Sequence, residues 1–413
     1  MDGNQRKLIT IYLCVWLVAI IMTSLGIYDM DIPSVFSRNL ILLHLVGFTL
    51  GTVLIRTKTS VVSRQGVSSK NIEIQIEKFL KSPLFRILLI IMTLYATYLF
   101  GRYWAKVTYY NSISETRDQF LDIYGALYYN FTKSLLFLPM SIICYILFGY
   151  AVFRKRDWVC LLMGYFLLVN ASLMGGRFGY VYILLGIIFV NIFIIKESAT
   201  KYIVGMVGLV LGALVLIVIV TAFRHGIVSL DKENLEIGMD VAGEQLVTYV
   251  TGSQIAFDYA IDNHYLSIAG GYGKGIFTFS PIINFVNLFT STLAGIDIAP
   301  GFMKFVNYLE ENQIFIGGFM GWNALYTSVL FYYIDGGVIG VFIFPLFIGL
   351  FFSLVYKQML RKGSVLLYAL VLYFFICIVK GVFKFEIVYA YDTFVLLLMY
   401  FLGTRKIKFY GNK

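Results

Sequence analysis

Arginines stand at the ends of long apolar runs, where this chain otherwise carries few charges. Arg177 lies in the corner MGGRFGY (174–180), while Arg102 and Arg224 each follow the last residues of an apolar run. A guanidinium can bind phosphate through two parallel hydrogen bonds, and the glycines beside Arg177 leave room for a ligand to approach. We therefore predict Arg177 and Arg224 as ligands of a diphosphate, with Arg117 and Arg102 next.

A second interpretation of these arginines is that each side chain extends to the membrane interface and binds no ligand. Arg177 argues against this interpretation, because its corner is short and the nearest acids lie more than sixteen residues away. A charge near the membrane interior usually has a partner. That partner is an anionic ligand or an acid from another helix.

If a hydroxyl group displaced this diphosphate it would require a base, because a hydroxyl is a poor nucleophile. His225, which follows Arg224 directly, is one candidate, and Glu244 and Asp258 are two others. His264 is a further candidate. Each of these residues also has a plain structural interpretation as a solvated loop residue.

A second set of polar residues accompanies glycines later in the chain. Asp335 precedes Gly336 and Gly337, so it either orients a ligand or caps the helix that begins after the glycines. Lys274 lies in the segment GGYGKGIFTFSP (270–281), which lacks the Lys-Ser/Thr pair of a phosphate-binding loop.

Metal and cofactor sites receive no support from the sequence. The four cysteines lie singly in apolar runs, and His and Cys residues do not cluster at the spacing of a zinc site. We expect no metal and no cofactor.

These residues must be positioned by membrane helices. The chain has 413 residues, of which 59% are hydrophobic and only 14% are charged, whereas about 25% of the residues of a soluble domain are charged. A helix of about 20 apolar residues spans a bilayer. We predict an all-α polytopic membrane protein with about ten spans, at 8–27, 35–55, 84–104, 131–153, 158–174, 178–195, 202–223, 336–356, 364–383 and 386–403.

The basic residues give this layout an orientation. With the N-terminus inside, the inner segments hold 20 of the 33 Lys and Arg residues but only five of the 23 Asp and Glu residues. Basic residues favour the cytoplasmic side, so both termini are predicted to be cytoplasmic. The net charge of +10 is then explained by topology and contact with anionic lipid, which argues against a nucleic-acid partner. The apolar segment 322–334 is too short to span, and we predict a re-entrant or interfacial helix there.

We treat 1–413 as a single integral membrane domain with three notable segments. The cytoplasmic segment 56–83 contains an amphipathic stretch, 71–80, that we expect to lie along the membrane. On the outer side, 105–130 forms one loop and 224–335 forms a large loop with short helices. Within the large loop, 240–261 has the spacing of an amphipathic helix, and 282–296 is expected to be an interfacial helix.

Three features together resemble the Wzy-type oligosaccharide repeat-unit polymerases, the O-antigen and capsular polysaccharide polymerases related to the O-antigen ligases. The first is the Gly-Arg corner at 174–180, and the second is the long outer loop between late spans. The third is the segment 321–350, in which Asn323 and an aromatic run precede Asp335, Gly336 and Gly340. Members of that family often carry a second, arginine-containing glycine-rich motif in the long loop; this chain departs from the pattern, because GGYGKG (270–275) has Lys274 instead, and lysine does not offer the same paired hydrogen bonds.

This resemblance implies a metal-independent, GT-C-like membrane glycosyltransferase in the bacterial plasma membrane, with an active site that faces the periplasm or cell exterior. Its substrates would be undecaprenyl-diphosphate-linked oligosaccharides. The glycan-binding residues would then be Asn323, Asp335, His264 and Lys274, and the base would activate a sugar hydroxyl. The growing glycan would be transferred to the terminal sugar of another lipid-linked unit, and undecaprenyl diphosphate would leave. Membrane lipid, a chain-length-regulating co-polymerase and a flippase are the implied partners.

Two other functions stay open at the sequence level. A ligase-like transferase would move a finished glycan to a different acceptor, and the sequence separates it poorly from a polymerase. A lipid-linked glycan flippase would instead show charges in mid-span, paired repeats and broken helices. The mostly apolar spans and polar outer loops favour a transferase.

Overall fold

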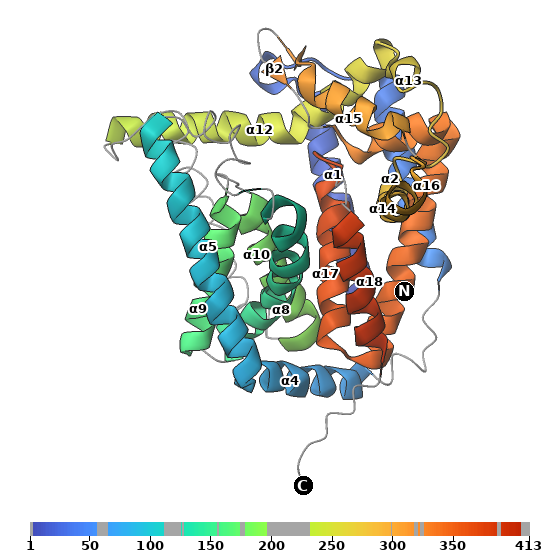
Figure 1. The fold of residues 1–413 in the computed structure, drawn as a ribbon. Coiled ribbons are helices and arrows are strands. Elements are labelled where there is room, and N and C mark those ends of the chain that lie inside the picture. The colour runs from blue at the N-terminus through green and yellow to red at the C-terminus, as the bar shows by residue number, and fades with distance from the viewer. Residues whose placement is uncertain are drawn as a thin grey trace. The chain divides into compact units, whose positions relative to one another are not determined.

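The computed structural model describes residues 3–55, 65–110, 125, 128–154, 157–173, 178–195, 232–298, 300–317, 321–322, 326–385 and 390–405. These residues are mostly helical, as the sequence predicts (Figure 1). The chain divides into two compact units. Unit 1 comprises Met1–Val62, Glu244–Lys357 and Phe374–Phe394, and unit 2 comprises Ser63–Gly243, Gln358–Tyr373 and Val395–Lys413.

Five described helices are long and apolar enough to cross a membrane. They correspond to the first four predicted spans and the eighth: Gly3–Ser24 (α1), Val35–Leu54 (α2), Pro83–Val107 within α5, Phe131–Arg154, and Ser328–Lys362 (α16). Shorter apolar helices occupy four further predicted spans, at Trp158–Ser172, Gly179–Ile195, Val365–Lys380 and Tyr391–Thr404. The described residues are thus mostly helical and carry the apolar helices of a membrane protein, while the predicted span at 202–223 lies outside the described residues.

Within unit 1, one end of α1 lies beside one end of both α2 and α16. The buried side chain of Gln5, near the start of α1, donates a hydrogen bond to Ser353 Oγ over 3.0 Å. Ser353 Oγ in turn donates to the carbonyl of Thr52, near the end of α2, over 3.1 Å. The start of α1 and the later parts of α2 and α16 therefore share one end of the unit. This agrees with the alternating directions that the predicted topology gives these helices.

Glycines bring α2 and α16 into close contact. Gly47 and Gly51 stand one helical turn apart, and a Cβ at either position would overlap the carbonyl oxygen of Phe342 or Leu346. From the other side, Gly349 approaches the backbone carbonyl of Phe48 in the same way. Small residues at this spacing allow two membrane helices to pack backbone against backbone.

The opposite ends of α1 and α2 meet the polar segment that the sequence places outside. This segment contains Lys232–Asp262 (α12), Tyr265–Ile268 (α13), Ser280–Ala294 (α14), Pro300–Glu311 (α15), and the antiparallel strands Ile314–Phe315 (β1) and Gly321–Trp322 (β2). Asp31 donates its backbone N–H to the carbonyl of Ile316, and Thr251 of α12 contacts Met30. The predicted helix at 240–261 is confirmed and is longer, and the helix predicted at 282–296 is α14.

The expectation for one short segment needs correction. The segment 322–334 is not one short helix, because Trp322 belongs to β2 and the helix begins only at Ser328. This helix is α16, and it is broken at Gly336 and Gly337, whose backbone angles are not helical.

Gln65–Lys81 (α4) in unit 2 contains the predicted amphipathic stretch. Its residues Ile72, Ile76 and Leu80 are buried. This helix contacts α5, Leu138–Arg154 (α8) and Asn191–Ile195 (η4), so protein covers these residues, and the expected position of the helix along the membrane stays a prediction.

The remainder of unit 2 is a group of apolar helices. Trp158–Ser172 (α9) packs against α5 and α8, and Phe178–Val190 (α10) packs against α8 and α9. Gly149 and Gly186 mark the close approach of α8 and α10, because a Cβ at either would lie about 3 Å from the other helix. Ile187, Met163 and Leu147 are buried in this group.

Candidate functional site

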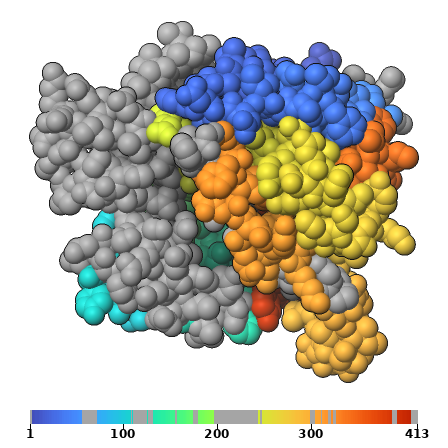
Figure 2. All heavy atoms as spheres, turned by 90° about the horizontal axis from the view of Figure 1, so that it is seen from above, coloured from blue at the N-terminus to red at the C-terminus, as the bar shows by residue number. Residues whose placement is uncertain are grey.

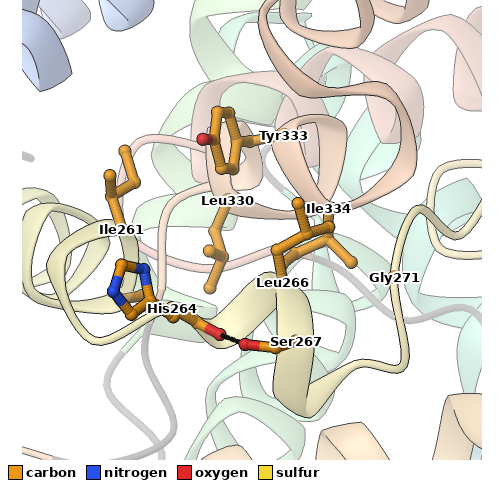
Figure 3. Close-up of a pocket in the computed structure, with 9 residues that line it drawn as sticks. Ile261, His264, Leu266, Ser267, Gly271, Leu330, Tyr333 and Ile334 are labelled. Carbon is orange, nitrogen blue, oxygen red and sulfur yellow. Dashed lines mark hydrogen bonds between the residues drawn. The ribbon is translucent and has the colours of Figure 1, made fainter.

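Unit 1 contains a pocket of about 370 Å³ within the described part of the chain (Figure 3). Its lining comes from the end of α12, from α13, from the glycine-rich loop that follows, and from the first turns of α16. Pockets of about 300–1,000 Å³ with apolar walls and a few polar groups commonly bind small ligands. The lining includes Ile261, His264, Ser267, Gly271, Leu330 and Tyr333.

His264 and Ser267 supply polar groups to this pocket. His264 has a φ of +56° and precedes α13, and its carbonyl accepts a hydrogen bond from Ser267 Oγ over 2.6 Å. The imidazole of His264 is exposed, so it remains accessible to a ligand. Figure 3 shows Tyr333 on the opposite side, with Leu330 between it and His264. The pocket thus combines an imidazole, a hydroxyl and an aromatic ring.

Asp335 holds the glycine-rich loop at one edge of this pocket. Its buried carboxylate accepts hydrogen bonds from the backbone N–H of Phe277 (3.1 Å), and from the N–H (2.6 Å) and hydroxyl (2.5 Å) of Thr278. The expected cap of its own following helix is therefore wrong: the carboxylate caps a different segment, 57 residues away. Because Gly271 and Ile334 line the pocket, this contact shapes the pocket wall.

The break in α16 explains why the loop docks there. Gly337 has a φ of +59°, which favours glycine, and the break leaves the carbonyls of Ile334 and Asp335 without helical partners. The N–H groups of Gly273 and Lys274 donate to these two carbonyls over 2.9 and 3.0 Å. The glycine-rich loop and the break in α16, both found as glycine-containing motifs in the sequence, are therefore bonded to each other. We call these contacts the Asp335 joint.

Lys274 contributes its backbone to this joint, while its side chain is exposed. It has a φ of +53°, an unusual conformation for a residue other than glycine. The side chain is free of the joint's hydrogen bonds, so its predicted contact with a glycan stays a prediction.

Asp258 has a structural partner. Its carboxylate accepts hydrogen bonds from the backbone N–H (3.0 Å) and the hydroxyl (2.5 Å) of Ser34, the residue that caps α2. Ser34 in turn accepts a hydrogen bond from the N–H of Ser37. Asp258 therefore joins α12 to the start of α2, and its predicted role as a base is not tested by this contact.

Other predicted site residues lie elsewhere or outside the described residues. Glu244 is half-buried on α12 and is not among the residues that line the pocket. Arg102 belongs to α5 in unit 2, where its exposed guanidinium lies 6.0 Å from the ring centre of Tyr98. The residues outside the described part are Arg117, Arg177, Arg224, His225 and Asn323.

Tyrosines pack behind the pocket. The ring of Tyr265, which follows His264, lies 5.5 Å from that of Tyr308 and 6.3 Å from that of Tyr326. Burial raises the pKa of Tyr265 and of Tyr326 above the ordinary tyrosine value. Both phenols therefore stay protonated near neutral pH and do not act as a base there.

The sequence did not single out Ser267 or Thr278, and it noted Tyr333 only within the aromatic run before Asp335. Only the glycines near these residues indicated a functional segment, because a serine or threonine in a loop has no distinctive pattern. Among the described residues, no three His, Cys, Asp or Glu side chains gather as a metal site would require. No family model, curated protein or solved structure matches the chain.

Proposed function

We propose that this protein is a membrane glycosyltransferase that joins lipid-linked oligosaccharide units at the outer face of a bacterial plasma membrane. The observation that carries the proposal is the pocket beside the Asp335 joint. The segment around Asp335, which resembles a motif of repeat-unit polymerases, meets the glycine-rich loop there, and His264, Ser267 and Tyr333 offer the groups that a sugar requires. The resemblance to Wzy-type polymerases supplies the reaction, and the apolar helices support a membrane location.

In this proposal the pocket receives the terminal sugar of the acceptor. Tyr333 packs against the apolar face of the sugar ring, while Ser267 and His264 bind hydroxyl groups. The acceptor hydroxyl attacks the anomeric carbon of the donor, and His264 accepts the hydroxyl proton as the new bond forms. The bond to the lipid diphosphate breaks, and the diphosphate leaves with the bonding electron pair.

The leaving diphosphate needs positive charge at the moment when its own negative charge grows. Arg177 and Arg224, followed by Arg117 and Arg102, remain the predicted ligands for it. In this proposal the protein itself supplies the cations. Arginine suits this role because its planar group binds two phosphate oxygens at once.

The test uses purified full-length protein in vesicles with the lipid-linked repeat unit extracted from the producing strain. No nucleotide sugar and no divalent metal are added, and chelator is present. A ladder of products that increases by one repeat unit at a time supports the proposal. Transfer of the unit across the bilayer without bond formation would instead show a flippase, and transfer only to a different acceptor would show a ligase.

His264→Asn tests the assignment of the pocket in the same assay. Asparagine tolerates the positive φ of this position, so the backbone is not strained by the change. Loss of the base should lower the rate of polymer formation by about 10²–10⁴-fold. The matched control is Asp262→Asn, an exposed neighbour on α12 that does not line the pocket and should leave the rate unchanged. An unchanged rate in His264→Asn would remove the imidazole from the reaction.

A further inference from the structure

The helix α14 is attached to unit 1 mainly through its first turn. Ser280 is its one buried residue, and the helix carries no charged side chain. Figure 2 shows the segment around it projecting from the rest of that face. An isolated helix of about 12–15 residues is only marginally stable in water, so a helix of this kind needs a surface to pack against.

One face of α14 is apolar and uncovered. Ile282, Val286, Phe289 and Leu293 recur at helical spacing and are 59%, 42%, 49% and 82% exposed. Ser291 is nine residues from Ile282, which places it about 180° away around the helix. The apolar stripe and Ser291 therefore lie on opposite faces of the helix.

The next helix along the chain, α15, has an apolar face that protein does cover. It is also amphipathic, but its apolar residues Phe305, Val306 and Leu309 are buried. The ring of Phe305 packs on that of Phe277 in the glycine-rich loop, with the ring centres 5.3 Å apart. Protein thus covers the apolar face of α15 and leaves that of α14 open.

The start of α14 is attached to the spanning helix α16. The ring of Phe279, directly before α14, contacts that of Phe344 in α16 (5.8 Å between centres), and Pro281 accepts a hydrogen bond from Thr393. On either side of Phe344, Ile339 and Phe347 are 75% and 51% exposed, as lipid-facing residues of a spanning helix are. Figure 1 shows α14 end-on beside α16, so that it runs across the spanning helix.

We propose that α14 lies in the plane of the bilayer and inserts its apolar stripe among the acyl chains of membrane lipids. Its position beside α16 keeps the glycine-rich loop, and with it the pocket, at the membrane surface. Because α14 has no Lys or Arg, the attraction is hydrophobic and does not depend on anionic lipid. The proposal requires only that the chain is membrane-embedded and is independent of the proposed reaction.

The test places a nitroxide spin label at single cysteines in a variant whose four native cysteines are replaced. Phe289→Cys and Leu293→Cys report on the stripe, and Ser291→Cys on the opposite face is the matched control. In phosphatidylcholine vesicles, the first two labels should collide more with oxygen than with a water-soluble nickel chelate. The control label should show the reverse, and adding phosphatidylglycerol should change neither result.

A measurement on the unmodified protein tests the same proposal even if a cysteine variant does not fold. A phospholipid with a photoactivatable diazirine in its acyl chain should give adducts on the stripe residues of α14, identified by mass spectrometry. Nickel access at Leu293→Cys together with an absence of adducts would show that the stripe faces water. Low access to both reagents with spin–spin coupling would show a second copy of the chain there. Either outcome would overturn the proposal.

Discussion

At the scale of single residues, Asp335 is the group on which the glycine-rich loop most depends. Asp335→Ala would leave the N–H groups of Phe277 and Thr278 buried without their acceptor, and each such group costs about 1–3 kcal/mol. Thr278→Val removes one hydroxyl bond and should cost about 1 kcal/mol. The thermal midpoint of purified protein in detergent should therefore fall more for Asp335→Ala than for Thr278→Val.

Glu311→Gln is the matched control for this comparison, because Glu311 is an exposed carboxylate at the end of α15. Its midpoint should equal that of the unchanged protein. Equal midpoints for Asp335→Ala and Glu311→Gln would show that the carboxylate does not hold the loop.

At the scale of elements, the packing of α2 on α16 depends on two glycines. A Cβ at Gly47 or Gly51 overlaps the backbone of α16, and overpacking of this kind costs about 1–3 kcal/mol. Gly47→Ala and Gly51→Ala should each lower the thermal midpoint in detergent, and more so in combination. Gly101→Ala in α5 is the control, because among the described residues no atom outside its own stretch of helix lies within 4 Å of its Cβ position. That change should leave the midpoint unchanged or raise it, since alanine favours a helix by about 1 kcal/mol over glycine.

The sequence predicted these elements better than it predicted the contacts between them. Apolar length alone located α1, α2 and α16, because a bilayer imposes both length and composition on a spanning helix. The partners of two acids could not be predicted, because Asp335 bonds to a loop 57 residues away and Asp258 bonds to Ser34, 224 residues away. No periodic pattern encodes such pairs. They depend on how the chain folds back, and the glycines beside Asp335 marked only where a turn was possible.

At the scale of the whole molecule, the pocket must lie at one end of α16. Residues 338–362, which follow the break in α16, extend about 37 Å as a helix and are long enough to cross a hydrocarbon core of about 30 Å. The first turns of α16, with Leu330 and Tyr333, then lie beyond the core. Arg361 and Lys362 in its last turn favour the cytoplasmic side for the other end. The pocket is therefore predicted on the outer face.

Cysteine labelling from the two sides of the membrane tests this orientation. In a variant without native cysteines, Ser267→Cys in the pocket and Arg6→Cys at the start of α1 are both exposed positions. Gln5, next to Arg6, bonds to Thr52 and Ser353 in the later parts of α2 and α16. The pocket lies at the beginning of α16, so the two cysteines should face opposite sides of the membrane. A membrane-impermeant maleimide added to intact cells should modify Ser267→Cys alone, and should modify Arg6→Cys only after the membrane is opened.

The reverse pattern would invert the topology and place the pocket in the cytoplasm, where flipped lipid-linked glycans are absent, so the proposed polymerase would lose its substrate. Labelling of both cysteines in intact cells would mean that the start of α1 is not cytoplasmic, which contradicts the charge distribution on which the layout rests.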